Sequence, residues 1–143
     1  MVTIRRMQKN DIETVYDMGM KVEGFAVSES TRFWTKEELY RWIDSKDDVL
    51  LVAEDEGKII GYIMSRLHIP TRNAIIENVY VDERYRRKEI GSNLVRECLK
   101  QLKEKGTTYL YGLVKRDDKI TIEFLKSLGF KRGYDFTWME LSL

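Results

Sequence analysis

The chain has 143 residues, which fits one domain with a hydrophobic core. Its 25 lysines and arginines nearly balance its 24 aspartates and glutamates, and this argues against a nucleic-acid-binding protein, whose domains are usually strongly basic. The single cysteine excludes an intrachain disulfide framework and a cysteine-based zinc site, and no stretch has the apolar length of a signal peptide or a membrane span.

These properties predict a single domain over residues 1–143, located in the cytoplasm, with no metal site and with neither nucleic acid nor membrane as a partner. Cys98 lies on an apolar helical stripe, so we expect it to be a packing residue. His68, the only histidine, stands beside Pro70 in a loop and is expected to have an ordinary surface role.

The first half of the chain predicts one strand and two helices. They are a strand at 3–7, a helix at about 12–22 behind Asn10 and Asp11, and a second helix that ends near 45–48. The second helix begins with a capping-box pattern, in which the Thr35 hydroxyl accepts from the backbone near Glu38 and the Glu38 carboxylate reaches back. Residues 23–33 between the helices have no clear period and predict a loop.

The second half predicts a β-meander followed by alternating helices and strands. The expected strands are 49–54, 59–67, 74–81, 107–114 and 134–143, and the expected helices are 90–105 and 117–128. Gly57 should supply a positive φ in the first hairpin turn. Gly106 and the Gly129-Phe130 pair are typical of helix C-termini.

The element order predicts an α/β (α+β) protein. The long meander favours a largely antiparallel sheet, and the strand–helix–strand unit from 75 to 114 favours one parallel pair within it. We expect helices on both faces of this sheet. The aromatic last strand, with Tyr134, Phe136 and Trp138, could serve a homodimer contact.

A basic, glycine-containing loop precedes the long helix at 90–105. A helix N-terminus offers free backbone N–H groups and the positive end of the helix dipole, and cationic side chains add to both. The loop therefore predicts an anion site, most usefully for a phosphorylated cofactor. Its residues are Arg86, Arg87, Lys88, Glu89, Ile90, Gly91 and Ser92.

The chain resembles the GNAT superfamily of N-acetyltransferases at this loop. The family signature for acetyl-coenzyme A is Arg/Gln-x-x-Gly-x-Gly/Ala, and here Arg86, Glu89 and Gly91 take its defining positions. In a second family landmark, with Asn, Tyr and Gly-Phe, Asp118 takes the Asn position and Leu125 the Tyr position, and Gly129-Phe130 matches. The resemblance implies the GNAT acyl-CoA N-acyltransferase fold, with a mixed, mostly antiparallel sheet of about seven strands flanked by about four helices.

The resemblance also implies a site and a reaction. Acetyl-CoA would donate its acetyl group directly to a primary amine of a polyamine-like small molecule or of a protein, in a ternary complex. The loop at 86–92 would bind the pyrophosphate, and Asp118 and Leu125 would belong to the same cofactor site. The strand at 74–81 would diverge from the strand at 107–114, so that the backbone of Val79, Tyr80 and Val81 could pair with the pantetheine amides.

Glu77 is the predicted catalytic base. It lies within an otherwise apolar strand, on the same face as Ile75 and Val79 by alternation, and a charge there needs a purpose or a partner. In the polyamine-acetyltransferase branch of the family, a glutamate at the matching position is the proposed base. The alternative reading is a glutamate at a solvated edge or in a structural ion pair.

Two departures from the family pattern bear on activity. Glu89 replaces a glycine beside the pyrophosphate, although with helical φ and ψ it could still donate its N–H. Leu125 replaces a tyrosine that protonates the departing thiolate in many relatives, so Tyr111, Tyr134, water or no acid at all must serve. These departures support an alternative function, a catalytically weak coenzyme A-binding sensor or assembly module. The resemblance implies that the irregular segment at 23–33 shapes the acceptor site, and one of Glu23, Glu29 and Phe33 is a weaker candidate for contact with the substrate.

Overall fold

The computed structural model describes all 143 residues, and the chain divides into two compact units, Met1–Leu113 and Val114–Leu143. The first unit contains a five-stranded sheet and three α-helices, and the second contains one α-helix followed by a segment without regular structure. The expectation that residues 1–143 form a single domain stays a prediction.

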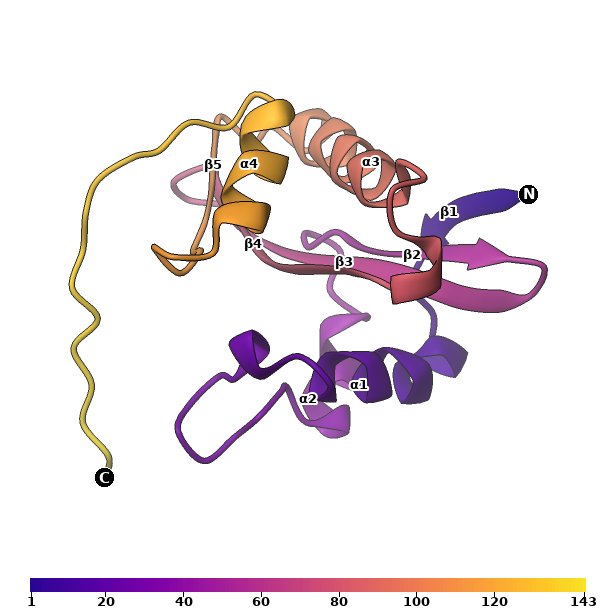
Figure 1. Cartoon of the computed structure of the whole chain (residues 1–143), viewed down its shortest axis with the longest axis horizontal. Coiled ribbons are helices and arrows are strands. Elements are labelled where there is room, and N and C mark those ends of the chain that lie inside the picture. The colour runs from indigo at the N-terminus through magenta and orange to yellow at the C-terminus, as the bar shows by residue number, and fades with distance from the viewer. The chain divides into compact units, whose positions relative to one another are not determined.

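The sheet of the first unit has its strands in chain order (Figure 1). Neighbouring strands are antiparallel except for the last pair, β4 and β5, which run parallel, as the strand–helix–strand pattern predicted. The bounds of the strands are β1 Val2–Arg6, β2 Leu50–Asp55, β3 Lys58–His68, β4 Asn73–Val81 and β5 Tyr109–Gly112.

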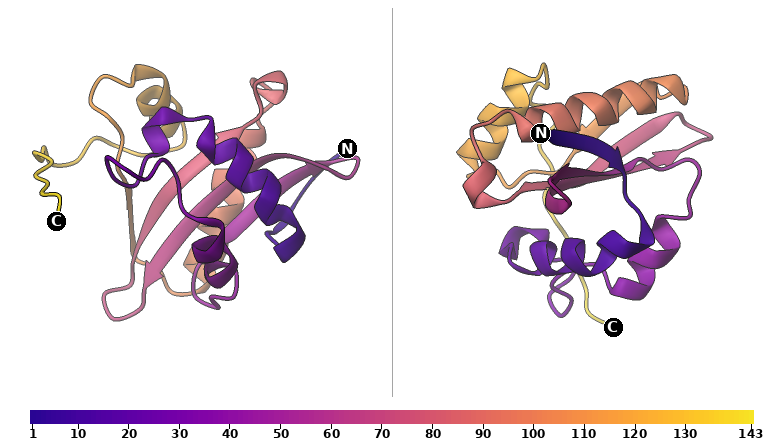
Figure 2. Two further views of the ribbon diagram at one scale, coloured as in Figure 1. Left: turned by 90° about the horizontal axis from the view of Figure 1, so that it is seen from below. Right: turned by 90° about the vertical axis from the view of Figure 1, so that its right-hand side faces the viewer.

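Helices cover both faces of this sheet, as expected. Helices α1 (Ile12–Met20) and α2 (Lys36–Trp42) lie on one face, and α3 (Ile90–Glu104) lies on the other (Figure 2). The buried residues of α3 recur at helical spacing, which is why this helix turns one side to the strands: Ile90, Leu94, Val95, Cys98 and Leu102. No helix of the structure is long and apolar enough to cross a membrane.

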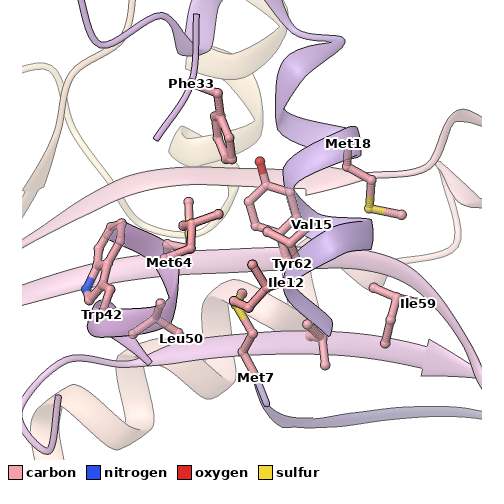
Figure 3. Close-up of a cluster of buried hydrophobic side chains, with 12 residues drawn as sticks. Met7, Ile12, Val15, Met18, Phe33, Trp42, Leu50, Ile59, Tyr62 and Met64 are labelled. Carbon is pink, nitrogen blue, oxygen red and sulfur yellow. The ribbon is translucent and has the colours of Figure 1, made fainter. Parts of the chain in front are cut away.

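The core between the sheet and α1 is built around aromatic rings (Figure 3). Tyr62 of β3 is fully buried, and the Phe33 ring meets it at a centroid distance of 6.4 Å and an angle of 66°. Phe33 also packs against Gly19 of α1, where an added Cβ would collide with the ring. Phe33 is therefore a core residue, and a contact of Glu23, Glu29 or Phe33 with the substrate stays a prediction.

The helix ends follow local sequence signals. Gly106 has φ +90° and Gly129 has φ +96°, and each closes its helix with the paired backbone hydrogen bonds of a Schellman motif. The Thr35 hydroxyl accepts from Glu38 N at 3.1 Å, as the capping box predicted. The Glu38 carboxylate, however, extends toward Arg66 of β3.

The predicted strand at 134–143 is absent, and the sheet has five strands, fewer than the expected seven or so. The alternating aromatic pattern favours a strand, but a strand forms only where its backbone pairs with another strand. Within the second unit the only regular element is α4 (Lys119–Ser127), so this partner is missing. Tyr134, Phe136 and Trp138 are largely exposed.

Candidate active site

The C-terminal end of β4 has an unpaired edge on the side of β5. The pairing of β4 with β5 stops at Ile76 and Gly112, whereas the pairing of β4 with β3 continues to Val81. Residues 77–81 therefore have no partner strand on the β5 side. The backbone of Val79, Tyr80 and Val81 lies on this unpaired edge, and backbone groups on such an edge can pair with an extended amide-bearing ligand, as the resemblance implied.

Glu77 stands at a β-bulge in β4. In the register with β3, Met64 faces Asn78 and Ser65 faces Ile76, so Glu77 is the extra residue. A bulge next to a site redirects a side chain, and here the Glu77 carboxylate points toward Arg66 on the face covered by α2.

The bulge also changes which residues share a face with Glu77. Val79 pairs with Ile63 of β3. Gly61 and Ser65, which lie two residues before and after Ile63 on that strand, both face α3, so Ile63 faces α3 as well. Cross-strand partners lie on the same face, so Val79 lies on the α3 face and Glu77 on the other. The expectation that alternation places Glu77 and Val79 together is therefore wrong, because an inserted residue reverses the alternation.

The carboxylate of Glu77 is half-buried, and the surroundings raise its pKa. The largest cause is burial, which disfavours the charged form, and the negative charge of Asp48 adds to it, while Arg66 acts in the opposite direction. Arg66 Nε lies 3.7 Å from Glu77 Oε1, which is an ion pair but exceeds hydrogen-bonding distance. The carboxylate oxygens thus remain free to accept a proton.

The loop between β4 and α3 contains two residues in the left-handed region, Arg87 with φ 64° and Glu89 with φ 62°. Glu89 is the N-cap residue of α3, with ψ 10°, so the condition of helical dihedrals at this position is not met. Glycine adopts this conformation without cost, whereas a residue with a Cβ is strained. A glycine in the family signature fits this backbone better than the glutamate of this chain.

The first turn of α3 presents free backbone donors. The first backbone hydrogen bond of the helix runs from Asn93 N to Glu89 O, and no side chain caps the N–H groups of Ile90, Gly91 and Ser92. Arg87, Lys88 and Glu89 are exposed around this turn. Free N–H groups at a helix N-terminus beside cationic side chains fit a pyrophosphate.

Arg86 is oriented differently from its loop neighbours. Its Nε donates to Val81 O at 2.9 Å, and its guanidinium carbon lies 5.7 Å from the centroid of the Tyr80 ring. Arg86 thus ties the loop back to the end of β4. In this position the side chain orders the loop, and its predicted contact with the pyrophosphate stays a prediction.

Asp118 and Leu125 belong to the second unit. The Asp118 carboxylate caps α4, accepting from Thr121 N at 3.1 Å and from Thr121 Oγ1 at 2.7 Å. The Leu125 carbonyl accepts the backbone N–H of Phe130 in the Schellman motif. Their structural roles in α4 are clear, and their expected contact with the cofactor stays a prediction.

The sequence did not predict the cluster of aromatic and acidic side chains around Arg66. Its guanidinium lies beside the indoles of both Trp34 and Trp42 and near the carboxylates of Glu38 and Glu77. Trp42 is buried. The available signal was an arginine inside the apolar strand at 59–67, but only the tertiary structure identifies its partners.

Cys98 and His68 have the ordinary surroundings expected of them, and the catalytic role considered for Tyr111 and Tyr134 stays a prediction. Cys98 is buried, burial raises the pKa of its thiol to about 11, and its Sγ lies 3.6 Å from Ser65 Oγ. His68 is exposed and shares a hydrogen bond with Thr71. Tyr111 of β5 is 43% exposed, and Tyr134 lies in the second unit.

Known proteins resemble this chain along most of its length. An uncharacterised N-acetyltransferase of Methanocaldococcus jannaschii is 27% identical over 141 residues, which cover 90% of this chain and only 60% of that relative. The spermidine N(1)-acetyltransferase of Thermoplasma acidophilum is 26% identical over 144 residues, which cover 91% of this chain and 88% of the relative.

The fold is shared with a solved structure, the PaiA N-acetyltransferase of Thermoplasma acidophilum in complex with coenzyme A. The TM-score is 0.80 at 24% identity, over 92% of this chain and 90% of the other. The model of the acetyltransferase (GNAT) family matches residues 20–130, including the open end of β4, the basic loop and α3. The chain belongs to this family of acetyltransferases, as the residues of the loop suggested.

Proposed function

We propose that this protein transfers the acetyl group of acetyl-CoA to a primary amine, in a ternary complex. The observation that carries the proposal is Glu77, a half-buried carboxylate with a raised pKa at the point where β4 loses its neighbour. The chain spans only part of the Methanocaldococcus jannaschii relative, so the proposal concerns the chemistry of this acetyltransferase domain.

The chain's own backbone supplies the proposed cofactor site. Acetyl-CoA, when bound, brings an acetyl group activated as a thioester. The N–H groups of Ile90, Gly91 and Ser92, with Arg87 and Lys88, bind the pyrophosphate. The open edge at 79–81 pairs with the pantetheine amides, and an N–H group on this edge polarises the thioester carbonyl as an oxyanion hole does.

Glu77 is proposed as the base that prepares the amine. An alkylamine with a pKa near 10 is mostly protonated at neutral pH, and only its neutral form can attack a thioester. A carboxylate accepts this proton directly or through a water molecule. Burial strengthens Glu77 as a base, because its raised pKa lies closer to that of the amine.

No dedicated acid is required for the leaving group. Leu125, at the position of the family tyrosine, cannot donate a proton, but a thiol with a pKa of about 8.5 leaves readily as a thiolate. Tyr111 is the alternative donor within the first unit, since it pairs with Ile75 near the point where β4 and β5 diverge. The Tyr111→Phe variant distinguishes the two mechanisms, because it should lose activity only if Tyr111 protonates the departing thiolate.

The acceptor is proposed to be a polyamine or a similar small amine. The similarity to a spermidine acetyltransferase over 88% of that relative supports this class. A protein amine is the alternative acceptor.

The test is release of free thiol from acetyl-CoA in the presence of a panel of polyamines, monoamines and peptides. The Glu77→Gln variant should lose about 10²- to 10⁴-fold in kcat/KM, the usual contribution of a general base. Glu56→Gln, in the exposed β2–β3 turn, is the matched control and should retain full activity.

Two outcomes would contradict the proposal. Equal turnover of Glu77→Gln and the unaltered protein between about pH 6 and pH 9 would remove Glu77 from the mechanism. Binding of coenzyme A without turnover of any amine would support instead a sensor or assembly module, the role to which Glu89 and Leu125 point.

A further inference from the structure

The guanidinium of Arg66 is held by aromatic rings. Its carbon lies 4.1 Å from the ring centroid of Trp42 and 5.1 Å from that of Trp34. The two indoles contact each other edge to face, with centroids 5.5 Å apart and planes at 77°. Cation–π contacts with these two adjoining rings attract the guanidinium without using any of its hydrogen-bond donors.

Two carboxylates face this guanidinium at the same distance. Arg66 Nη2 lies 3.7 Å from Glu38 Oε1, and Arg66 Nε lies 3.7 Å from Glu77 Oε1. Both separations are too long for a hydrogen bond, and the buried Nε has no hydrogen-bond partner. The positive charge therefore lies close to both carboxylates and against the two rings, without a hydrogen bond to either carboxylate.

Building on the proposed function, we propose that Arg66, held against Trp34 and Trp42, is a positioning residue that keeps Glu77 ionised while leaving its oxygens free for the acceptor amine.

The physical basis is a balance of charges around Glu77. Burial and Asp48 both favour the protonated carboxyl group, and Arg66 is the cation that opposes them. Glu38 of α2 lies near another nitrogen of the same guanidinium, Nη2, and competes for its charge. A protonated Glu77 could not accept a proton from an amine, so Arg66 widens the pH range in which the base is competent.

The experiment measures the titration of the Glu77 carboxyl carbon by NMR in the full chain without acetyl-CoA. In Arg66→Gln the midpoint should rise by about one pH unit, since an opposite charge at this range lowers a carboxyl pKa by roughly that amount or more. In Arg66→Lys, which keeps a positive charge, the midpoint of the Glu77 titration should lie closer to that of the unaltered protein. Arg41→Gln, which removes an exposed arginine of α2, is the matched control and should leave the midpoint unchanged.

A second variant gives the opposite sign. In Glu38→Gln the guanidinium loses its competing partner and should lower the Glu77 midpoint, and this effect should vanish when Arg66→Gln is added. An unchanged midpoint in Arg66→Gln would overturn the proposal. If Arg66→Gln does not fold, an unchanged or raised midpoint in Glu38→Gln would overturn it.

The acid limb of the pH profile of kcat/KM provides the functional readout. It should shift upward in Arg66→Gln together with the NMR midpoint, whereas a merely structural role would lower activity equally at all pH values. Because the NMR titration needs no turnover, failure of the proposed acetyl transfer would leave the role of Arg66 separately testable.

Discussion

Two arginine–carboxylate pairs on the same sheet are built in opposite ways. At β1, Arg5 donates to both carboxylate oxygens of Asp11, at 2.8 and 2.9 Å, and also to Glu54 at 3.1 Å. At β3, Arg66 approaches Glu77 no closer than 3.7 Å and stacks on tryptophan rings. We call the first pair closed, because both carboxylate oxygens accept hydrogen bonds from the arginine. We call the second pair open, because the arginine donates no hydrogen bond to the carboxylate.

The protonation behaviour of the two carboxylates differs accordingly. At Asp11, burial acts to raise the pKa, but hydrogen bonds from Arg5 and from Gln8 N together outweigh it, so the pKa is lowered. At Glu77, burial dominates and the pKa is raised. The carboxylate of the closed pair is held ionised by its hydrogen bonds and stabilises the fold, whereas the carboxylate of the open pair can still accept a proton.

The largest expected effect lies at the closed pair. Asp11→Asn leaves a charged, partly buried Arg5 without its bidentate partner and should lower the free energy of unfolding by about 3 kcal/mol. Chemical denaturation at neutral pH measures this. Glu37→Gln, which opens an exposed pair with Arg41, should cost less than about 1 kcal/mol. Similar losses in the two variants would contradict the comparison.

A smaller effect, with a defined pH dependence, is expected at the open pair. Because the folded-state pKa of Glu77 is raised, the folded protein binds more protons than the unfolded chain between the ordinary and the raised pKa. The stability of the unaltered protein relative to Glu77→Gln should therefore fall as pH rises through that window and stay level above it.

Asp11 should give the opposite trend, because the folded-state pKa of this group is lowered. The stabilisation that it provides is present above the ordinary pKa of aspartate and is lost as pH falls through the folded-state value. Denaturation curves of Glu77→Gln and Asp11→Asn across the acid range would show both slopes. Slopes of the same sign would mean that the two pairs do not differ as described.

The smallest effect is expected in the loop beside the open pair. Glu89→Gly should raise the free energy of unfolding by about 0.5–1 kcal/mol, because glycine relieves the left-handed strain at φ 62°. Glu83→Gly in the same loop, within the 3-10 turn Glu83–Tyr85, should instead lower it. Thermal melts compare the two, and a stabilised Glu83→Gly would refute the conformational argument.

Local signals in the sequence determined much of this protein. The helix stops at Gly106 and Gly129, the cap at Thr35 and the apolar stripe of α3 each depend on residues within one or two turns. For the same reason, the basic loop ahead of α3 was recognisable as an anion site, and its spacing indicated the family. Hydrogen bonds and periodicities of this kind are complete within a short segment, so they can be read without the fold.

Contacts between distant segments were decided only by the tertiary structure. The bulge at Glu77 requires the register of β3, and the strand expected at 134–143 lacks a partner in its own unit. The cluster around Arg66 forms only when β3, β4 and α2 pack together. It brings Arg66 next to Trp34, Trp42, Glu38 and Glu77. Burial and the charges of neighbouring elements then set the pKa of Glu77, and no local pattern encodes either.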